Sequence, residues 1–412
     1  MRSSIFLPAV FLTILMALPA CELFDQDLVP DEPKKIDLRK KSAEIIEADQ
    51  LFAFELFKQV YTLSDEVNMM ISPLSVSYAL GMTYNGAAGT TLEAFNEVLH
   101  FGDLTNQEVN ESYKDLMNQL IHLDEQVEFS IANSIWYKLG YPVLDEFIIT
   151  NQDYFDAAVE ELDFSDPGAV DVINGWIEDK TNDKIRDMLD FIPSDAVMYL
   201  VNAIYFNAKW KYQFDPEDTY EGEFHLEDGS AFDADFMKIN GSFNYTANED
   251  FTAVELPYGD STFSMVVMLP TGNNNLDDLV DRMDIDTWNT WFASPTTQNV
   301  QIELPKFTYD FKDLLNDPLI NLGLGIAFGG GADFSRITPG GDLYISRVIH
   351  QTFIDVEEEG TEAAAATIVE IKEISAPVIT MFKANSPFLF VIRENSTSAI
   401  MFMGKVGRPE YP

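Results

Sequence analysis

The sequence predicts an α+β fold with large, mostly antiparallel β-sheets. Helical patterns crowd the first half of the chain and strand patterns the second, without the regular alternation of a parallel βαβ protein. The clearest patterns are two segments with apolar residues at helical spacing and three short β-rich runs bounded by Gly, Pro or Asn: 43–61 and 171–189 for helix, 264–269, 300–304 and 388–392 for strand.

Domain organisation is simple after the first forty residues. From residue 42 onward there is no composition break, no low-complexity insert and no repeat of fixed period, so 42–412 is expected to form one domain. With 46% hydrophobic and 23% charged residues, that domain is globular. The formal charge of −44 disfavours nucleic acid as a partner and repels anionic lipid surfaces.

Motifs for enzyme chemistry are missing from the sequence. The four histidines include no His-Glu-x-x-His pair, and the single cysteine rules out cysteine-rich zinc sites. No nucleophile elbow, Walker loop or dinucleotide glycine pattern occurs. We therefore expect no catalytic residues, no metal site and no cofactor.

Residues 1–20 have the pattern of an export signal, because a positive residue precedes an apolar run too short for an ordinary membrane span. The run ends in Leu18-Pro19-Ala20-Cys21, which resembles the lipobox of bacterial lipoproteins, although a proline is unusual there. This resemblance implies a lipid attached to Cys21, a membrane contact through that lipid, and an outer-membrane or cell-surface lipoprotein. A plain cleaved signal, with secretion, is the alternative. Residues 21–41 are charged and are expected to be a flexible tether.

The segment from Glu357 to Thr367 fits two opposite local structures. Its four alanines, with Thr361 as a cap, favour a helix. As a strand, it would have one uncharged face, whose first side chains are small enough to slide between neighbouring strands without overpacking. Gly360 would permit a turn before it. The alternation separates uncharged from charged positions: Thr361, Ala363, Ala365, Thr367, Val369 and Ile371 against Glu362, Glu370 and Lys372.

The run Glu-Glu-Gly-Thr-Glu-Ala-Ala-Ala-Ala-Thr in this segment closely resembles the proximal hinge of inhibitory serpins, a family of single-use protease inhibitors. The resemblance extends over about 42–409 and implies the serpin fold: α+β, with three β-sheets, about eight or nine helices and an exposed reactive-centre loop at about 358–380. Further matches follow in order along the chain: Asn68–Leu99, Asp163–Leu189, Asn202–Trp210, Leu343–His350, Phe382–Phe390 and Phe402–Val406.

The resemblance also implies roles for single residues. Trp210 matches the tryptophan of the breach, where the loop enters the main sheet; alone, it would be read as core. Two longer sets match the shutter, a polar cluster where the central strands of that sheet part, and the hinge. They are Ser72, Ser75, Asn202 and His350 for the shutter, and Glu358, Glu359, Gly360, Thr361, Glu362, Ala363, Ala364, Ala365 and Ala366 for the hinge. Alone, Ser72 would be read as a helix cap and His350 as a core histidine.

The resemblance also implies a position for the cleaved bond. In inhibitory serpins the attacked residue lies sixteen positions after the hinge glutamate matched by Glu358, which indicates Ile374 and a bond to Ser375. The flanking residues resemble the loop of a plasma elastase inhibitor of the family. A β-branched aliphatic fits a shallow apolar pocket, so elastase-like serine proteases are the expected targets. This loop is longer than in that relative, and Lys372-Glu373, which would attract trypsin-like enzymes, is the competing bond.

The function implied is irreversible suicide-substrate inhibition, not enzyme catalysis. The target protease is acylated at Ile374, the freed strand inserts into the main sheet, and the covalent complex is trapped. Papain-like cysteine proteases are a second class of target. A monomer is expected, and heparin is not a partner, because Lys114 is the only basic residue in the candidate region 102–120.

Two other functions remain as alternatives. A non-inhibitory serpin, acting as chaperone, carrier or storage protein, is disfavoured because such relatives often have charged or bulky residues or proline at hinge positions that are small here. A glycan-binding surface lipoprotein is disfavoured because the aromatic residues lie within core-like patterns.

Overall fold

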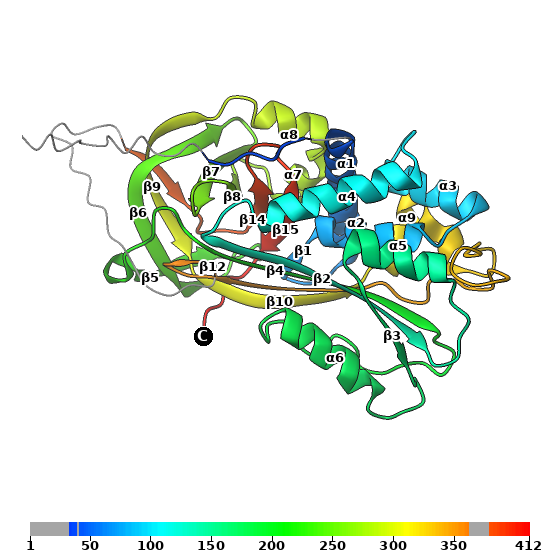
Figure 1. Ribbon diagram of the computed structural model, residues 1–412. Coiled ribbons are helices and arrows are strands. Elements are labelled where there is room, and N and C mark those ends of the chain that lie inside the picture. The colour runs from blue at the N-terminus through cyan, green and yellow to red at the C-terminus, as the bar shows by residue number, and fades with distance from the viewer. Residues whose placement is uncertain (1–32, 39–40, 362–378) are drawn as a thin grey trace, which may run out of the picture. The chain divides into compact units, whose positions relative to one another are not determined.

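The computed structural model describes residues 33–38, 41–361 and 379–412. Within them the chain forms α-helices and two β-sheets (Figure 1). The helices are α1 (Ser42–Leu63), α2 (Pro73–Tyr84), α3 (Gly89–Val98), α4 (Asn106–Ile121), α5 (Asp145–Phe155), α6 (Ala169–Lys180), α7 (Leu276–Arg282), α8 (Ile285–Trp291) and α9 (Asn316–Leu322), with short 3-10 turns at Pro216–Asp218 and Leu324–Phe328.

Local sequence signals account for several helix ends. Thr105 and Glu108 form a reciprocal capping box at the start of α4, and α1 matches the helix expected at 43–61. The helix expected at 171–189 was too long, because α6 ends at Lys180. Asn182, Asp183 and Asp187 have positive φ angles, which a right-handed helix cannot contain. The apolar residues that extended the pattern pack beneath α6 from an irregular segment.

The first sheet has six strands in the order β10-β11-β12-β4-β2-β3. The strands flanking the short β12 are β11 and β4, which run parallel to each other because each pairs antiparallel with β12. The strands are β10 (Phe307–Leu314), β11 (Ile349–Val356), β12 (Gly360–Thr361), β4 (Met198–Lys209), β2 (Val127–Lys138) and β3 (Ala158–Leu162).

The second sheet has nine strands, in the order β1-β15-β14-β8-β7-β6-β9-β13, with β5 paired to β6. Two sheets therefore stand where three were expected, because the long strand β6 pairs in succession with β5, β9 and β7 and joins them all by hydrogen bonds. The strands are β1 (Asn68–Ile71), β5 (Tyr220–His225), β6 (Ala231–Ala247), β7 (Phe251–Tyr258), β8 (Phe263–Pro270), β9 (Thr296–Pro305), β13 (Thr380–Lys383), β14 (Phe388–Glu394) and β15 (Ile400–Val406).

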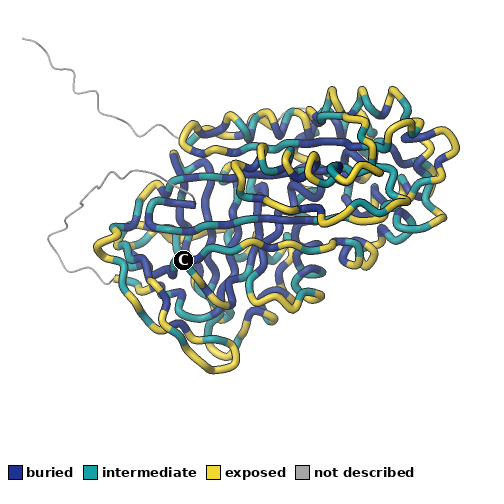
Figure 2. The backbone as a smooth tube through the Cα atoms, turned by 90° about the horizontal axis from the view of Figure 1, so that it is seen from below, coloured by how far each residue is buried: buried dark blue, intermediate teal, exposed yellow. Residues whose placement is uncertain are grey.

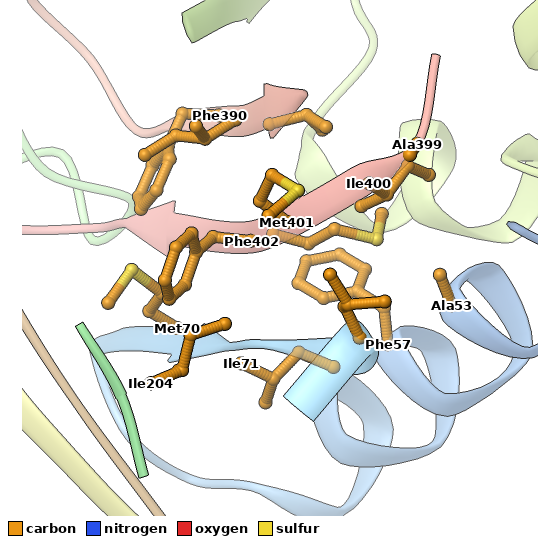
Figure 3. Close-up of a cluster of buried hydrophobic side chains, with 14 of the residues drawn as sticks. Ala53, Phe57, Met70, Ile71, Ile204, Phe390, Ala399, Ile400, Met401 and Phe402 are labelled. Atoms are coloured by element: carbon orange, nitrogen blue, oxygen red, sulfur yellow. The ribbon is translucent and has the colours of Figure 1, made fainter. Parts of the chain in front are cut away.

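The main hydrophobic core lies where helices and both sheets meet. Figure 3 shows side chains of α1, β1, β4, β14 and β15 converging there, among them Phe57, Ile71, Ile204 and Phe402. A smaller core under α6 joins Ile173 and Ile177 to β2 and β4. The strands β2 and β4 therefore have a hydrophobic core on each face, and Figure 2 shows buried residues gathered inside the fold with exposed residues at its edges.

Part of the segment expected as a tether packs on the domain. Ile36 is buried, and its backbone N–H donates to Ser396 Oγ at 3.1 Å. The amide of Gln119 binds the backbone of Asp37 on both sides, accepting from its N–H at 2.6 Å and donating to its carbonyl at 3.0 Å. None of the described helices combines the length and the apolar character needed to cross a membrane.

Candidate functional site

His350 on β11 and Ser72 at the start of α2 form the centre of the predicted shutter. Ser72 donates its backbone N–H to His350 Nε2 at 3.0 Å and its hydroxyl to the carbonyl of Met401 at 2.8 Å. The Ser72 oxygen also caps α2 by accepting from the backbone N–H of Ser75 at 3.3 Å. Because Nε2 accepts a hydrogen bond, His350 is neutral, and burial lowers its pKa to about 4.

Asn202 on β4 extends this network across the sheet. It accepts a hydrogen bond from the hydroxyl of Ser75 and donates to Asn133 Oδ1 at 2.7 Å. Asn133 on β2 in turn donates to the carbonyl of Phe155 at 2.6 Å. The four predicted shutter residues therefore lie in one hydrogen-bonded cluster that links α2 to both β11 and β4.

The hinge begins with a tight turn between β11 and β12, which we call the hinge hairpin (Glu357–Gly360). Its end residues exchange hydrogen bonds, from Glu357 N–H to Gly360 O at 3.0 Å and from Gly360 N–H to Glu357 O at 3.3 Å. A Cβ atom on Gly360 would lie 2.2 Å from the carbonyl oxygen of Ala208, so only glycine fits there.

Thr361 is already seated between the two central strands. It opposes Val356 on one side and Ala208 on the other, and its side chain is buried. Its hydroxyl shares a hydrogen bond of 2.8 Å with that of Tyr258. Thr361 therefore faces the core, as the strand pattern predicted.

Trp210 ties the hinge hairpin to the top of β4. Its backbone N–H donates to Glu359 O at 3.0 Å, and its indole N–H donates to Glu357 O at 2.9 Å. The indole ring stacks on Tyr258 with centroids 4.4 Å apart. Trp210 thus lies where the resemblance placed the breach.

Glu358 is held by an ion pair. Its carboxylate lies 2.9 Å from Lys306 Nζ and accepts from the Thr219 hydroxyl at 2.8 Å. Burial alone would raise the pKa of Glu358, but its hydrogen bonds and the positive charge of Lys306 together outweigh burial and hold the pKa below its ordinary value.

Below Thr361, β11 and β4 flank a slot. Among the described residues, these two strands are connected by backbone pairing only through β12. A narrow cavity of about 20 Å³ lies under Thr361, between 204–206 and 352–355. A wide cavity of about 380 Å³ follows, lined by 195–202 and 342–350 together with α2.

The other predicted site residues lie outside the described residues. They are Cys21, the hinge residues Glu362, Ala363, Ala364, Ala365 and Ala366, the bond Ile374–Ser375 and the competing Lys372. In the described part of the chain, no group of three or more His, Cys, Asp or Glu side chains is placed to hold a metal ion.

Comparison with known proteins identifies the family. The family model described as serpin (serine protease inhibitor) matches residues 47–409. The chain belongs to the serpin family. Serpins are generally protease inhibitors rather than enzymes. The assignment of the residues described above to a hinge, a breach and a shutter stays a prediction.

Relatives of this serpin occur in archaea and in animals. An uncharacterised serpin-like protein of Methanosarcina acetivorans is 38% identical over 89% of this chain and 88% of its own length. Human serpin B4 is 33% identical over 88% of this chain and 99% of its own.

Solved serpin structures share the fold along most of their length. Tengpin, a thermophilic serpin in the native state, is 32% identical with a TM-score of 0.81, and the match covers 91% of this chain and 96% of tengpin. Human thyroxine-binding globulin is 25% identical with a TM-score of 0.82, covering 90% and 99%.

Three residues of the site had no recognised signal in the sequence. Asn133 opposes Asn202 across β2 and β4, Tyr258 supports both Trp210 and Thr361, and Lys306 neutralises Glu358. Asn133 and Tyr258 come from the strands β2 and β7, and Lys306 comes from the link between β9 and β10. All three are distant in sequence from the residues that they contact, and periodicity does not reveal such contacts.

Proposed function

We propose that this serpin is an irreversible suicide-substrate inhibitor of serine proteases. The observation that carries the proposal is the seating of Thr361 between β11 and β4, at the upper end of an open slot. A loop cleaved further along could continue this strand into the slot. Its backbone would pair with strands on both sides, and its inward side chains would be buried.

The register of β12 supports a strand that reaches residue 374. Thr361 pairs with Ala208 and with Val356, so position 374 in the same register would oppose Asp195 on one side and Leu343 on the other. The wide cavity is lined by 195–202 on one side and 342–350 on the other. In the extended register, 195–202 would oppose positions 367–374, and 342–350 would oppose positions 367–375. The slot thus has the length needed for cleavage at Ile374–Ser375.

The shape of the slot agrees with the side chains that would enter it. In this register Ala363 and Ala365 would fall in the narrow cavity, and the larger Val369 and Ile371 in the wide one. Thr367 would arrive between Asn202 and His350, the polar residues of the shutter, where its hydroxyl could find partners.

The proposed reaction uses no catalytic group of the serpin. The protease serine attacks the carbonyl of Ile374, forms an ester with it and releases Ser375 as a new amino terminus. Insertion of the upstream strand then moves the protease before water hydrolyses that ester. The aliphatic Ile374 supports elastase-like targets, with papain-like cysteine proteases, or trypsin-like enzymes acting at Lys372, as alternatives.

We also propose that the protein is exported and, through a lipid on Cys21, held at the cell surface. The lipobox resemblance supports this. The packing of residues 33–38 on the domain leaves the segment before residue 33 as the connection to such an anchor.

A protease panel tests the inhibitory function. The purified serpin is incubated with elastase-like, trypsin-like and papain-like enzymes, and each mixture is analysed for a denaturant-resistant complex and for the cleaved bond by mass spectrometry. The proposal predicts a covalent complex with an elastase-like protease through Ile374. Cleavage without any complex across the panel would contradict it and favour a carrier or storage serpin.

A further inference from the structure

The C-terminal segment of the chain ends against the hinge hairpin. Two of the hydrogen bonds that hold this segment are made to Asn68 and Thr308: the side-chain Oδ1 of Asn68 accepts from Gly407 N–H at 2.9 Å, and Thr308 N–H at the start of β10 donates to Glu410 O at 2.8 Å. These contacts bring Tyr411 beside the turn where β11 becomes β12, and Figure 1 marks this end of the chain.

Tyr411 and Lys306 together hold two consecutive glutamates of the turn. The Tyr411 hydroxyl donates to Glu357 Oε2 at 2.8 Å, and Lys306 Nζ lies 4.0 Å from the centre of the tyrosine ring. The same ammonium group forms the 2.9 Å ion pair with Glu358, and both of these charged side chains are at most 14% exposed. Solvent therefore screens this ion pair only weakly.

We propose that Tyr411 is a positioning residue that latches the hinge hairpin in its seated arrangement. Within the described residues β12 comprises Gly360 and Thr361, and the contacts at the turn add to their backbone pairing in holding the hinge. Insertion of the loop would lengthen β12 from this turn onward. The contact of Tyr411 with the turn therefore holds Gly360 and Thr361 in the position from which insertion would begin.

Hydrogen exchange of two backbone amides tests the latch directly. Trp210 N–H donates to Glu359 O and Phe214 N–H to Glu358 O, so both amides are protected only while the hairpin is seated. Tyr411→Phe removes the hydroxyl and keeps the ring over Lys306. A lost hydrogen bond to a carboxylate corresponds to about a tenfold faster exchange at both amides. Tyr411→Ala should exchange faster still.

Tyr61→Phe is the matched control, since it removes from α1 a tyrosine hydroxyl that also donates to a carboxylate, Asp277 Oδ1, at 2.7 Å, and Tyr61 contacts neither the hinge hairpin nor the slot. It should leave both amides unchanged. Amides in the buried strand β8 report on global unfolding and should not change in any variant. Unchanged exchange at Trp210 and Phe214 in both Tyr411 variants would overturn the proposal, as would equal acceleration in β8.

The role of the latch in inhibition rests on the proposed function, and a second measurement separates the two. Exchange is measured without any protease. The fraction of serpin trapped in complex, rather than cleaved and released, is then measured with an elastase-like enzyme. We expect this fraction to fall several-fold in Tyr411→Phe. Faster exchange with an unchanged fraction would confirm the seating contact and overturn its role in insertion. If the wild type protects the amides of Trp210 and Phe214 from exchange but forms no complex with the protease, the proposed function is contradicted and the seating contact is not.

Discussion

Replacing Thr361 with arginine should convert the inhibitor into a substrate. Thr361 is 5% exposed, between Val356 and an Ala208 that is 1% exposed, and its hydroxyl bonds that of Tyr258. An arginine would lose that hydrogen bond, worth about 1 kcal/mol, and would place a charge in a packed interior at a cost of several kcal/mol. A total of about 4 kcal/mol corresponds to roughly a thousandfold shift against the seated hinge.

The assay compares four proteins with one elastase-like protease. The wild type and Glu362→Arg should both form a large amount of denaturant-resistant complex, because in the strand pattern residue 362 points away from the core. It should be replaced by simple cleavage in Thr361→Arg, whose bond at Ile374 is unchanged. Thr361→Ser, which keeps the hydroxyl, should inhibit like the wild type. Equal complex formation by Thr361→Arg and Glu362→Arg would refute strand insertion in this register.

Three further predictions concern specificity, attachment and pH. Ile374→Arg should shift trapping from elastase-like to trypsin-like enzymes, and trapping of trypsin by the wild type at Lys372 would show the bond to be misplaced. Cys21→Ser should abolish labelling by a radioactive fatty acid and release the protein from membranes; an unlabelled wild type would contradict lipidation. Asp49 accepts from the Tyr113 hydroxyl at 2.8 Å, and its other oxygen is shielded from solvent, so burial raises its pKa to about 7. A carboxyl with a raised folded-state pKa destabilises the fold as pH rises from about 4 to 7, by a few kcal/mol; denaturation from pH 4 to 8 should show this decline, and Asp49→Asn should remove it.

The sequence predicted those parts of the site that are marked by a short local pattern of residues. The alternating pattern from Thr361 was confirmed at its first residue, because small uncharged side chains at every second position indicate a strand that can be buried. The helix suggested by the alanines does not begin at Thr361, which pairs in a sheet. Resemblance placed the shutter residues, and the structure shows how they bond.

What the sequence did not predict depends on contacts between distant segments. The expected helix at 171–189 stopped early because residues after Lys180 reach their buried positions through left-handed turns, which periodicity does not detect. In the part of the chain that the structure describes, two sheets formed in place of three because β6 pairs with three partners. The contact of Tyr411 with Glu357 joins residues 54 positions apart, and neither residue is marked by a motif.

Thermal denaturation before and after cleavage of the loop tests the central claim most directly. A protease that is not trapped is used to cut the bond at residue 374, and the midpoints of intact and cleaved protein are compared. Insertion would add a central strand paired on both sides and bury several apolar side chains. The midpoint should therefore rise by at least about 10 °C. An unchanged or lower midpoint after complete cleavage would contradict loop insertion.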